Sequence, residues 1–361
     1  MRRFTWLVNL TLVLTLMVIA LGAYTRLTDA GLGCPDWPGC YGRLTPPMKD
    51  VHIEAVQARF PDAQVDPFKA RNEMVHRYIA GLLGLCVLAI FVVAQRLRRA
   101  RGLSSVLLAL VLFQAALGMW TVTMNLMPVV VVAHLLGGFA LLSLLALLRV
   151  ELGRAPVAEG GASARAVAEP VPVALPTAEP RLGALFPFAC VAFGVALAQI
   201  ALGGWTSANY AALVCHQLPL CESGWTSHFS LRAAFSLPLG HETYEFGVLE
   251  YEARMSIHVL HRLGALLALL VIGSFALLCW RWARARAVRG LALALAGLLA
   301  LQVTLGLVNV IAQVPLANAV AHNVVGACLL AVLGVLVRQI QLRRVAPRAA
   351  ASAPARLAAQ R

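Results

Sequence analysis

The sequence has few charged residues. Only 13% of its 361 residues are Asp, Glu, Lys or Arg, whereas 60% are hydrophobic and the mean hydropathy is +0.78. A composition this apolar excludes a soluble protein of this size and is typical of membrane proteins. The chain also lacks an amphipathic, Arg- and Ser-rich segment before its first apolar run. We therefore expect a bacterial plasma membrane rather than import into an organelle.

The usual short metal and cofactor motifs are missing as well. Four cysteines are scattered through the apolar runs: Cys86, Cys190, Cys279 and Cys328. Because ligands of a zinc or copper site must converge at one depth, no such site is predicted. Cys215-His216 is not a covalent haem attachment site, since the cysteine required three positions earlier is Ala212.

Eight apolar runs are long enough to cross a membrane, which takes roughly 20 residues per helix. They cover about residues 5–24, 74–95, 103–122, 129–148, 183–204, 257–280, 289–311 and 317–339. The first run resembles a signal peptide, but it is long for one and a matching segment recurs later, so we expect a retained helix. The predicted fold class is an all-α integral membrane protein with eight transmembrane helices.

The net charge of +14 would suit a nucleic-acid partner, but its distribution indicates a membrane. Most of the 30 basic residues and few of the 16 acidic ones lie at alternate ends of the apolar runs. By the positive-inside rule, this pattern predicts that both termini are cytoplasmic. Anionic lipid headgroups are a sufficient partner for these arginines. We therefore expect contact with membrane lipid and no nucleic-acid partner.

The chain contains an internal repeat. An offset of 181 aligns Gly22 with Gly203 and one cysteine pair with the other. Offsets of 185 and 188 align His76-Arg77 with His261-Arg262 and His134 with His322. Each half has four predicted helices, so both halves keep the same orientation. The prediction is two four-helix bundles related by a pseudo-twofold axis along the membrane normal.

The repeat sets the predicted domain boundaries. They are an N-terminal bundle at 1–151, a cytoplasmic linker at 152–182, a C-terminal bundle at 183–340 and a disordered basic tail at 341–361. The linker is rich in Ala, Pro, Glu and Gly, which is typical of a flexible connector. The long loops 26–72 and 207–255 hold most of the acidic residues, and we expect them to cap the outer face.

Four histidines occupy matched positions near the outer ends of predicted helices: His76, His134, His261 and His322. Each half thus offers two imidazoles at similar depth on different helices. This arrangement grips an iron porphyrin from both faces inside a four-helix bundle. We therefore predict that the four histidines ligate haem iron. Arg77 and Arg262 follow two of them and either anchor haem propionates or extend to the interface.

One position differs between the halves in a way that bears on chemistry. Glu73 precedes His76 by three residues and shares its helix face, whereas His258 stands at the matching position before His261. The mismatch suggests that the first site holds a reacting molecule and the second a resident cofactor. The alternative is a first-turn glutamate favoured by the helix dipole. The role of His258 is left open.

Two close cysteine pairs lie in the outer loops, where an oxidising compartment permits disulfides. They are Cys34–Cys40, in GCPDWPGC, and Cys215–Cys221, in VCHQLPLC. Structural bridges that close the loops and redox-active dithiols both fit this pattern.

Two stretches resemble signatures of the haem A synthase family. They are GAYTRLTDAGLGCPDWPGC after the first predicted helix and EMVHRYIAG in the second, and the likeness extends over about residues 1–150 and 183–340. The resemblance implies a duplicated eight-helix membrane enzyme that oxidises the C8 methyl of haem O to the formyl group of haem A for terminal cytochrome oxidase. It also implies a haem b held by His261 and His322, haem O held by His76 and His134, and Glu73 as the catalytic carboxylate.

The resemblance further implies a supply of haem O from a haem O synthase. The electron acceptor, the source of the formyl oxygen and homo-oligomer formation are left open. A competing hypothesis is a bis-His haem b electron-transfer protein of the quinol oxidoreductase type. Such a protein would have two equivalent sites, and the mismatch between Glu73 and His258 argues against it. A transporter built from parallel repeats fits four matched histidines poorly.

Overall fold

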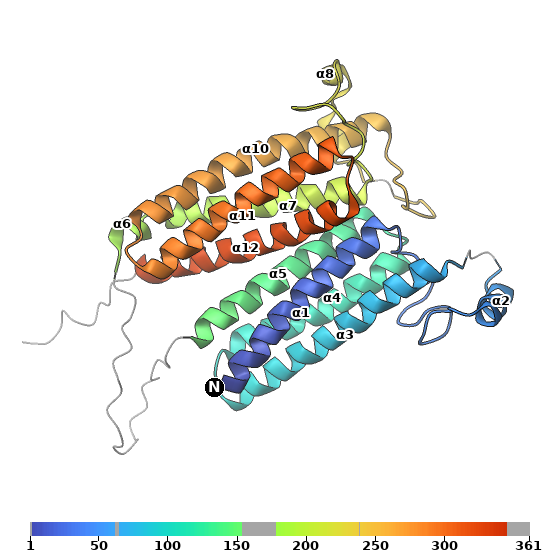
Figure 1. Ribbon diagram of the computed structural model, residues 1–361, viewed down its shortest axis with the longest axis horizontal. Coiled ribbons are helices and arrows are strands. Elements are labelled where there is room, and N and C mark those ends of the chain that lie inside the picture. Colours follow the sequence, from blue (N-terminus) through green and yellow to red (C-terminus); the bar gives the residue numbers. More distant parts are fainter. Residues whose placement is uncertain (1, 62–64, 154–177, 238, 345–361) are drawn as a thin grey trace, which may run out of the picture.

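The computed structural model describes residues 2–61, 65–153, 178–237 and 239–344, and this part of the chain is helical without a strand (Figure 1). Eight of its helices are long and apolar enough to cross a membrane, as predicted. Most of the predicted linker and tail lie outside the described residues. The final helix continues to Arg344, beyond the predicted start of the tail at 341.

The first four membrane helices are α1 (Arg2–Leu27), α3 (Pro67–Arg96), α4 (Arg101–Thr123) and α5 (Pro128–Leu152). Each packs against the next, and α1 closes the ring on α5. The last four are α7 (Phe186–Ala208), α10 (Tyr251–Trp282), α11 (Arg286–Ile311) and α12 (Leu316–Arg344), and they form a similar ring. The short α6 (Pro180–Gly183) precedes α7. The two groups meet where α5 and α1 contact α12, and where α5 contacts α7 (Figure 1).

Two helices begin well before their apolar runs. The Asp66 side chain caps α3 by accepting hydrogen bonds from the N–H groups of Phe68 and Lys69, and Pro67 occupies the first turn, where its missing N–H costs nothing. With 30 residues, α3 is about 45 Å long, which exceeds the hydrocarbon thickness of about 30 Å. We predicted apolar runs that begin at about residues 74 and 257, close to His76 and His261. These histidines instead lie more than two turns inside α3 and α10.

The outer loops contain the short helices α2 (Asp50–Arg59), α8 (Trp225–His228) and α9 (Leu231–Ala234). The first loop buries a small core of its own against the start of α3, made of Cys34, Cys40, Tyr41, Val56, Ala70 and Met74. Buried residues of the second outer loop pack against Trp205 of α7 and Ile257 of α10, and Val132 of α5 joins them. The loops thus cover the ends of the helices that carry the predicted site residues.

Candidate functional site

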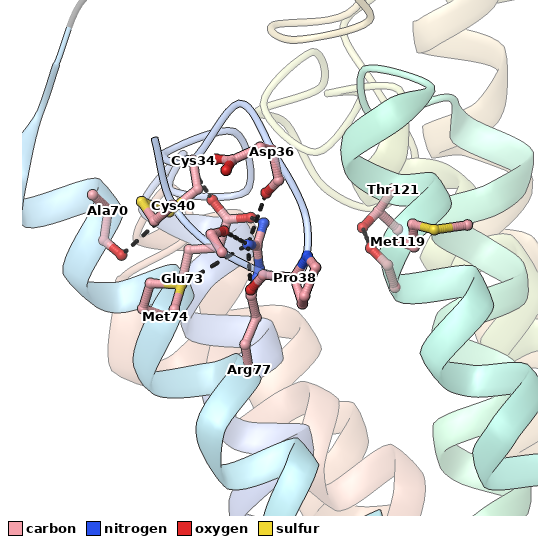
Figure 2. Close-up of polar contacts among 12 residues, drawn as sticks. Cys34, Asp36, Pro38, Cys40, Ala70, Glu73, Met74, Arg77, Met119 and Thr121 are labelled. Carbon is pink, nitrogen blue, oxygen red and sulfur yellow. Dashed lines mark hydrogen bonds and ion pairs between the residues drawn. A yellow bond between two sulfur atoms is a disulfide. The ribbon is translucent and has the colours of Figure 1, made fainter. Parts of the chain in front are cut away.

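Glu73 is buried beneath the first outer loop. Its residue is 4% exposed, and its Oε2 accepts the backbone N–H of Cys34 at 2.8 Å. Its Oε1 pairs with Arg77 one helical turn along α3 (Figure 2). The helix-dipole explanation is weakened, because that effect is confined to the first turn and α3 begins six residues earlier at Pro67.

Arg77 joins this carboxylate to the disulfide loop. Its Nη1 donates to the carbonyl oxygens of Asp36, at 2.9 Å, and of Gly39, while Nη2 holds Glu73 (Figure 2). Several donors in a rigid fork make Arg suited to such a bridge. Glu73 is therefore fixed from two directions, by a loop N–H and by a guanidinium that binds the same loop.

Arg262 makes the equivalent contacts in the second half. Its Nη2 donates to the Cys215 carbonyl at 2.7 Å, and its Nη1 donates to the Gln217 and Leu220 carbonyls, each at 2.5 Å. Both arginines thus hold a cysteine loop onto a helix. Their predicted contacts with haem propionates stay a prediction, and snorkelling to the interface alone does not account for these bonds.

Both predicted cysteine pairs form disulfides, Cys34–Cys40 and Cys215–Cys221. The first disulfide loop touches the backbone of α3 at Gly33. A Cβ atom at Gly33 would lie 2.5 Å from the carbonyl carbon of Lys69 and 2.7 Å from the N atom of Ala70. Only glycine fits this contact, which sets the position of the neighbouring Cys34 N–H group.

Replacing Gly33 by alanine is expected to lower any activity that depends on Glu73 by about a hundredfold, the cost of a displacement of roughly 1 Å at a reacting centre. The added methyl group would push the loop off α3 and carry the Cys34 N–H away from Glu73. The measurement is product formed per mole of purified protein. Gly84→Ala on α3 is the matched control, since nothing lies within 4 Å of its Cβ position. Equal losses in both variants would show that the loop contact is not what matters.

Each of the four predicted histidine ligands lies against a glycine of a neighbouring helix. A Cβ atom on Gly22 or Gly203 would lie 3.0 or 2.9 Å from Cε1 of His76 or His261, respectively. The corresponding distances are 3.5 Å from Gly118 to His134 and 3.2 Å from Gly306 to His322. Glycine lets a neighbouring helix approach this closely. A glycine of a neighbouring helix thus makes room for each of the four imidazole rings.

The four histidines also fit as residues that would hold haem iron. Nδ1 of His76, of His134 and of His322 is buried and has no hydrogen-bond partner. A buried imidazole nitrogen without a partner is rare unless something else binds it, and a pair of imidazoles on two helices is a haem donor set. The residues present therefore fit a haem in each half.

Glutamines contact the second pair of histidines, and neither was predicted to do so from the sequence. Gln199 Nε2 lies 3.1 Å from His261 Nδ1 and donates to the His261 carbonyl at 2.9 Å. Gln302 Nε2 lies 3.2 Å from His322 Nε2. At an offset of 181, Gln199 corresponds to Val18. A polar residue inside an apolar run, absent from the other copy, was the signal that could have identified it.

The side-chain Nε2 of the matching glutamine in the first half makes no such contact with His134. Gln114 corresponds to Gln302, but its Nε2 is buried without a hydrogen-bond partner. At the position of Glu73 the second half has His258, which is 4% exposed. The two sites therefore differ in their partners, although their histidines and glycines correspond.

Comparisons with known proteins agree with one another. The family described as "COX15-CtaA: Cytochrome oxidase assembly protein" matches residues 5–334. A protein of Shewanella oneidensis named "Heme A synthase" is 47% identical over 92% of this chain and 94% of its own length. A protein of the same name from Sphingopyxis alaskensis is 28% identical over 94% of this chain and 92% of its own length.

Proposed function

Since this chain belongs to the COX15-CtaA family of cytochrome oxidase assembly proteins, we propose that it is a haem A synthase, an integral membrane oxidoreductase that converts haem O to haem A. The observation that carries this conclusion is the buried Glu73, held by Arg77 and the Cys34 N–H one turn from His76. A carboxylate fixed beside one of two matched histidine pairs supports an enzyme rather than a symmetric electron carrier.

The fold is proposed to be a duplication, with an N-terminal bundle at 1–151 and a C-terminal bundle at 183–340. Two contacts between residues 181 apart support it. Arg26 Nη2 donates to the Ser207 carbonyl at 2.7 Å, and the Tyr210 hydroxyl lies 3.4 Å from Asp29 Oδ1. Equivalent residues can touch only close to the axis that relates the copies, so these pairs favour a pseudo-twofold axis between α1 and α7.

The orientation follows from charge. With arginines concentrated at one end of the helices, both termini are proposed to be cytoplasmic, and the disulfide loops face the periplasm of a bacterial inner membrane. This side is the one where disulfides persist. Anionic lipid headgroups would neutralise the arginines on the other side.

The two halves are proposed to hold different haems. His261 and His322 would ligate a resident haem b, and their glutamine neighbours support a permanent site, because partners around a metal ligand fix its orientation. His76 and His134 would hold the substrate haem O. The first half alone has a carboxylate, Glu73, three residues before its histidine, where the second half has His258.

Glu73 is proposed to accept protons released as the C8 methyl group is oxidised stepwise to the formyl group. Redox chemistry comes from bound haem, and the chain contributes orientation and proton transfer. Arg77 and the Cys34 N–H hold the carboxylate still, so that its lone pairs meet the substrate in one geometry. Helices and loops around it exclude water from the reacting group.

The partners we propose are a haem O synthase, which would deliver the substrate, and an electron acceptor of unassigned identity. The alternative, a bis-His electron-transfer protein, would use two equivalent haem b groups and make no new haem. The different environments of the two histidine pairs do not favour it.

The test is chromatography of haems extracted from cells that make haem O, with and without this chain. We expect a haem A peak only when the chain is present. Extracts that contain haem b and unchanged haem O would overturn the proposed activity.

A further inference from the structure

The loop before α10 crosses from the second group of helices to the first. Its residues Glu242–Phe246, here called the strap, bind the turn between α4 and α5. The Tyr244 N–H donates to the Asn125 carbonyl at 3.0 Å, and Asn125 Nδ2 donates to the Glu242 carbonyl at 2.7 Å. Tyr244 is buried, at 6% exposure. Two reciprocal hydrogen bonds thus join the strap to this turn.

The strap also contacts the outer end of α3 directly and is linked to the end of α1 through Tyr210. Glu245 Oε1 lies 3.8 Å from Lys69 Nζ, at the start of α3. The ring of Phe246 packs against Tyr210 at 5.9 Å, and the guanidinium of Arg26, at the end of α1, lies 4.0 Å above the same Tyr210 ring. In Figure 1 this loop leaves the start of α10 and extends toward the outer ends of the first-half helices.

The strap therefore ties together the helices that carry the first histidine pair. His76 lies two turns inward from Lys69 on α3, and His134 lies nine residues after Asn125 on α5. The strap is bonded to the start of α3 and to the turn before α5, and the region between these two outer ends is here called the outer mouth. It comes from the other half of the chain, so the first site is completed by the second half.

The corresponding turn of the second half has no strap. Gln313 and Val314 lie 188 residues after Asn125 and Leu126 and have the same left-handed backbone, with φ of 55° and 59° against 48° and 63°. Their N–H groups bond within their own turn, to Val310 and Asn309. Among the described residues, no outer loop donates to or accepts from this turn. The strap is therefore found at the first half, whose proposed haem is a substrate and must be exchanged.

We propose that the strap is a retaining element for haem in the first half: by fixing the α4–α5 turn to α3, it slows escape of haem O and its products through the outer mouth. This inference rests on the proposed function for the identity of the ligand. A resident cofactor needs no such element, whereas a substrate oxidised in several steps must stay bound until the last of them. Since the strap continues into α10, which carries His261, it also connects the two sites mechanically.

The test compares Asn125→Gly with Gln313→Gly in the full-length protein loaded with haem O. Glycine keeps the left-handed turn and removes only the side chain, so the two changes match. Transfer of haem to excess apomyoglobin is followed by absorption. We expect release of haem O to be about tenfold faster for Asn125→Gly, the effect of losing one hydrogen bond, and unchanged for Gln313→Gly. Equal release from Asn125→Gly and the unaltered protein would overturn the proposal.

A charge exchange provides the second measurement. Lys69→Glu should speed release of haem O, and adding Glu245→Lys should restore the original rate by re-forming the pair with opposite polarity. Retained haem b absorption shows that each variant is folded. The two hypotheses fail differently: an incorrect activity leaves the unaltered protein without haem A, whereas an incorrect strap leaves haem A production intact and release rates equal.

Discussion

Replacing Glu73 by glutamine is expected to lower haem A production by at least about a hundredfold, within the range for losing a positioned proton acceptor, while haem stays bound. Glutamine has nearly the same size, but its amide cannot accept protons and presents N–H donors where Arg77 and the Cys34 N–H need acceptors. The substitution leaves unchanged the four histidines and the glycines that contact them. The measurement is haem A and total haem per mole of purified variant.

The control is Glu252→Gln, the same change at an exposed carboxylate on the outer side, whose side chain is 58% exposed. It should make normal haem A. Normal production by Glu73→Gln would remove this residue from the chemistry, and loss of all bound haem would make it a structural residue instead.

The second large effect is expected from the histidines. His322→Ala should lose haem b to background and, with it, haem A production, because each axial ligand is half of the iron's protein donor set. His134→Ala should keep its haem b and lose bound haem O. The two variants are matched, since each ring lies at the same place in its half against a glycine of the preceding helix. Pyridine haemochrome spectra and chromatography of the extracted haems distinguish the outcomes.

Loss of haem b in His134→Ala, with haem b retained in His322→Ala, would reverse the assignment of the two halves. Loss of both haems in both variants would show that neither site is stable without the other. Gln199→Leu should weaken the binding of haem b and leave the binding of haem O unchanged. Chromatography of the same extracts would show the loss of haem b.

Much of the fold could be predicted because its signals are local. Eight apolar runs and two close cysteine pairs are properties of short stretches, and the structure confirms both. The starts of the helices were less predictable. The polar residues before His76 have the composition of a loop, although they form the first turns of α3. The cap formed by Asp66 and Pro67 is too short a signal to predict by itself that the helix begins there.

The site was predictable only as far as its residue types. The proposed repeat pointed to the four histidines and Glu73 as candidates, but not to the contacts that hold them. Arg77 contacts carbonyl oxygens some forty residues earlier in the chain, and every residue has such an oxygen, so no pattern of side chains marks this contact. The strap pairs Asn125 with Glu242, which lies 117 positions later, and the packing of the two halves that brings them together is a tertiary property.

The haem composition of the purified, unaltered protein tests the central claim most directly. The protein should be isolated from cells that supply haem O, and its haems extracted and separated. An asymmetric pair of sites predicts haem b together with haem O or haem A in the same preparation. Haem b alone, bound in both halves, would contradict the account and favour a symmetric electron-transfer protein.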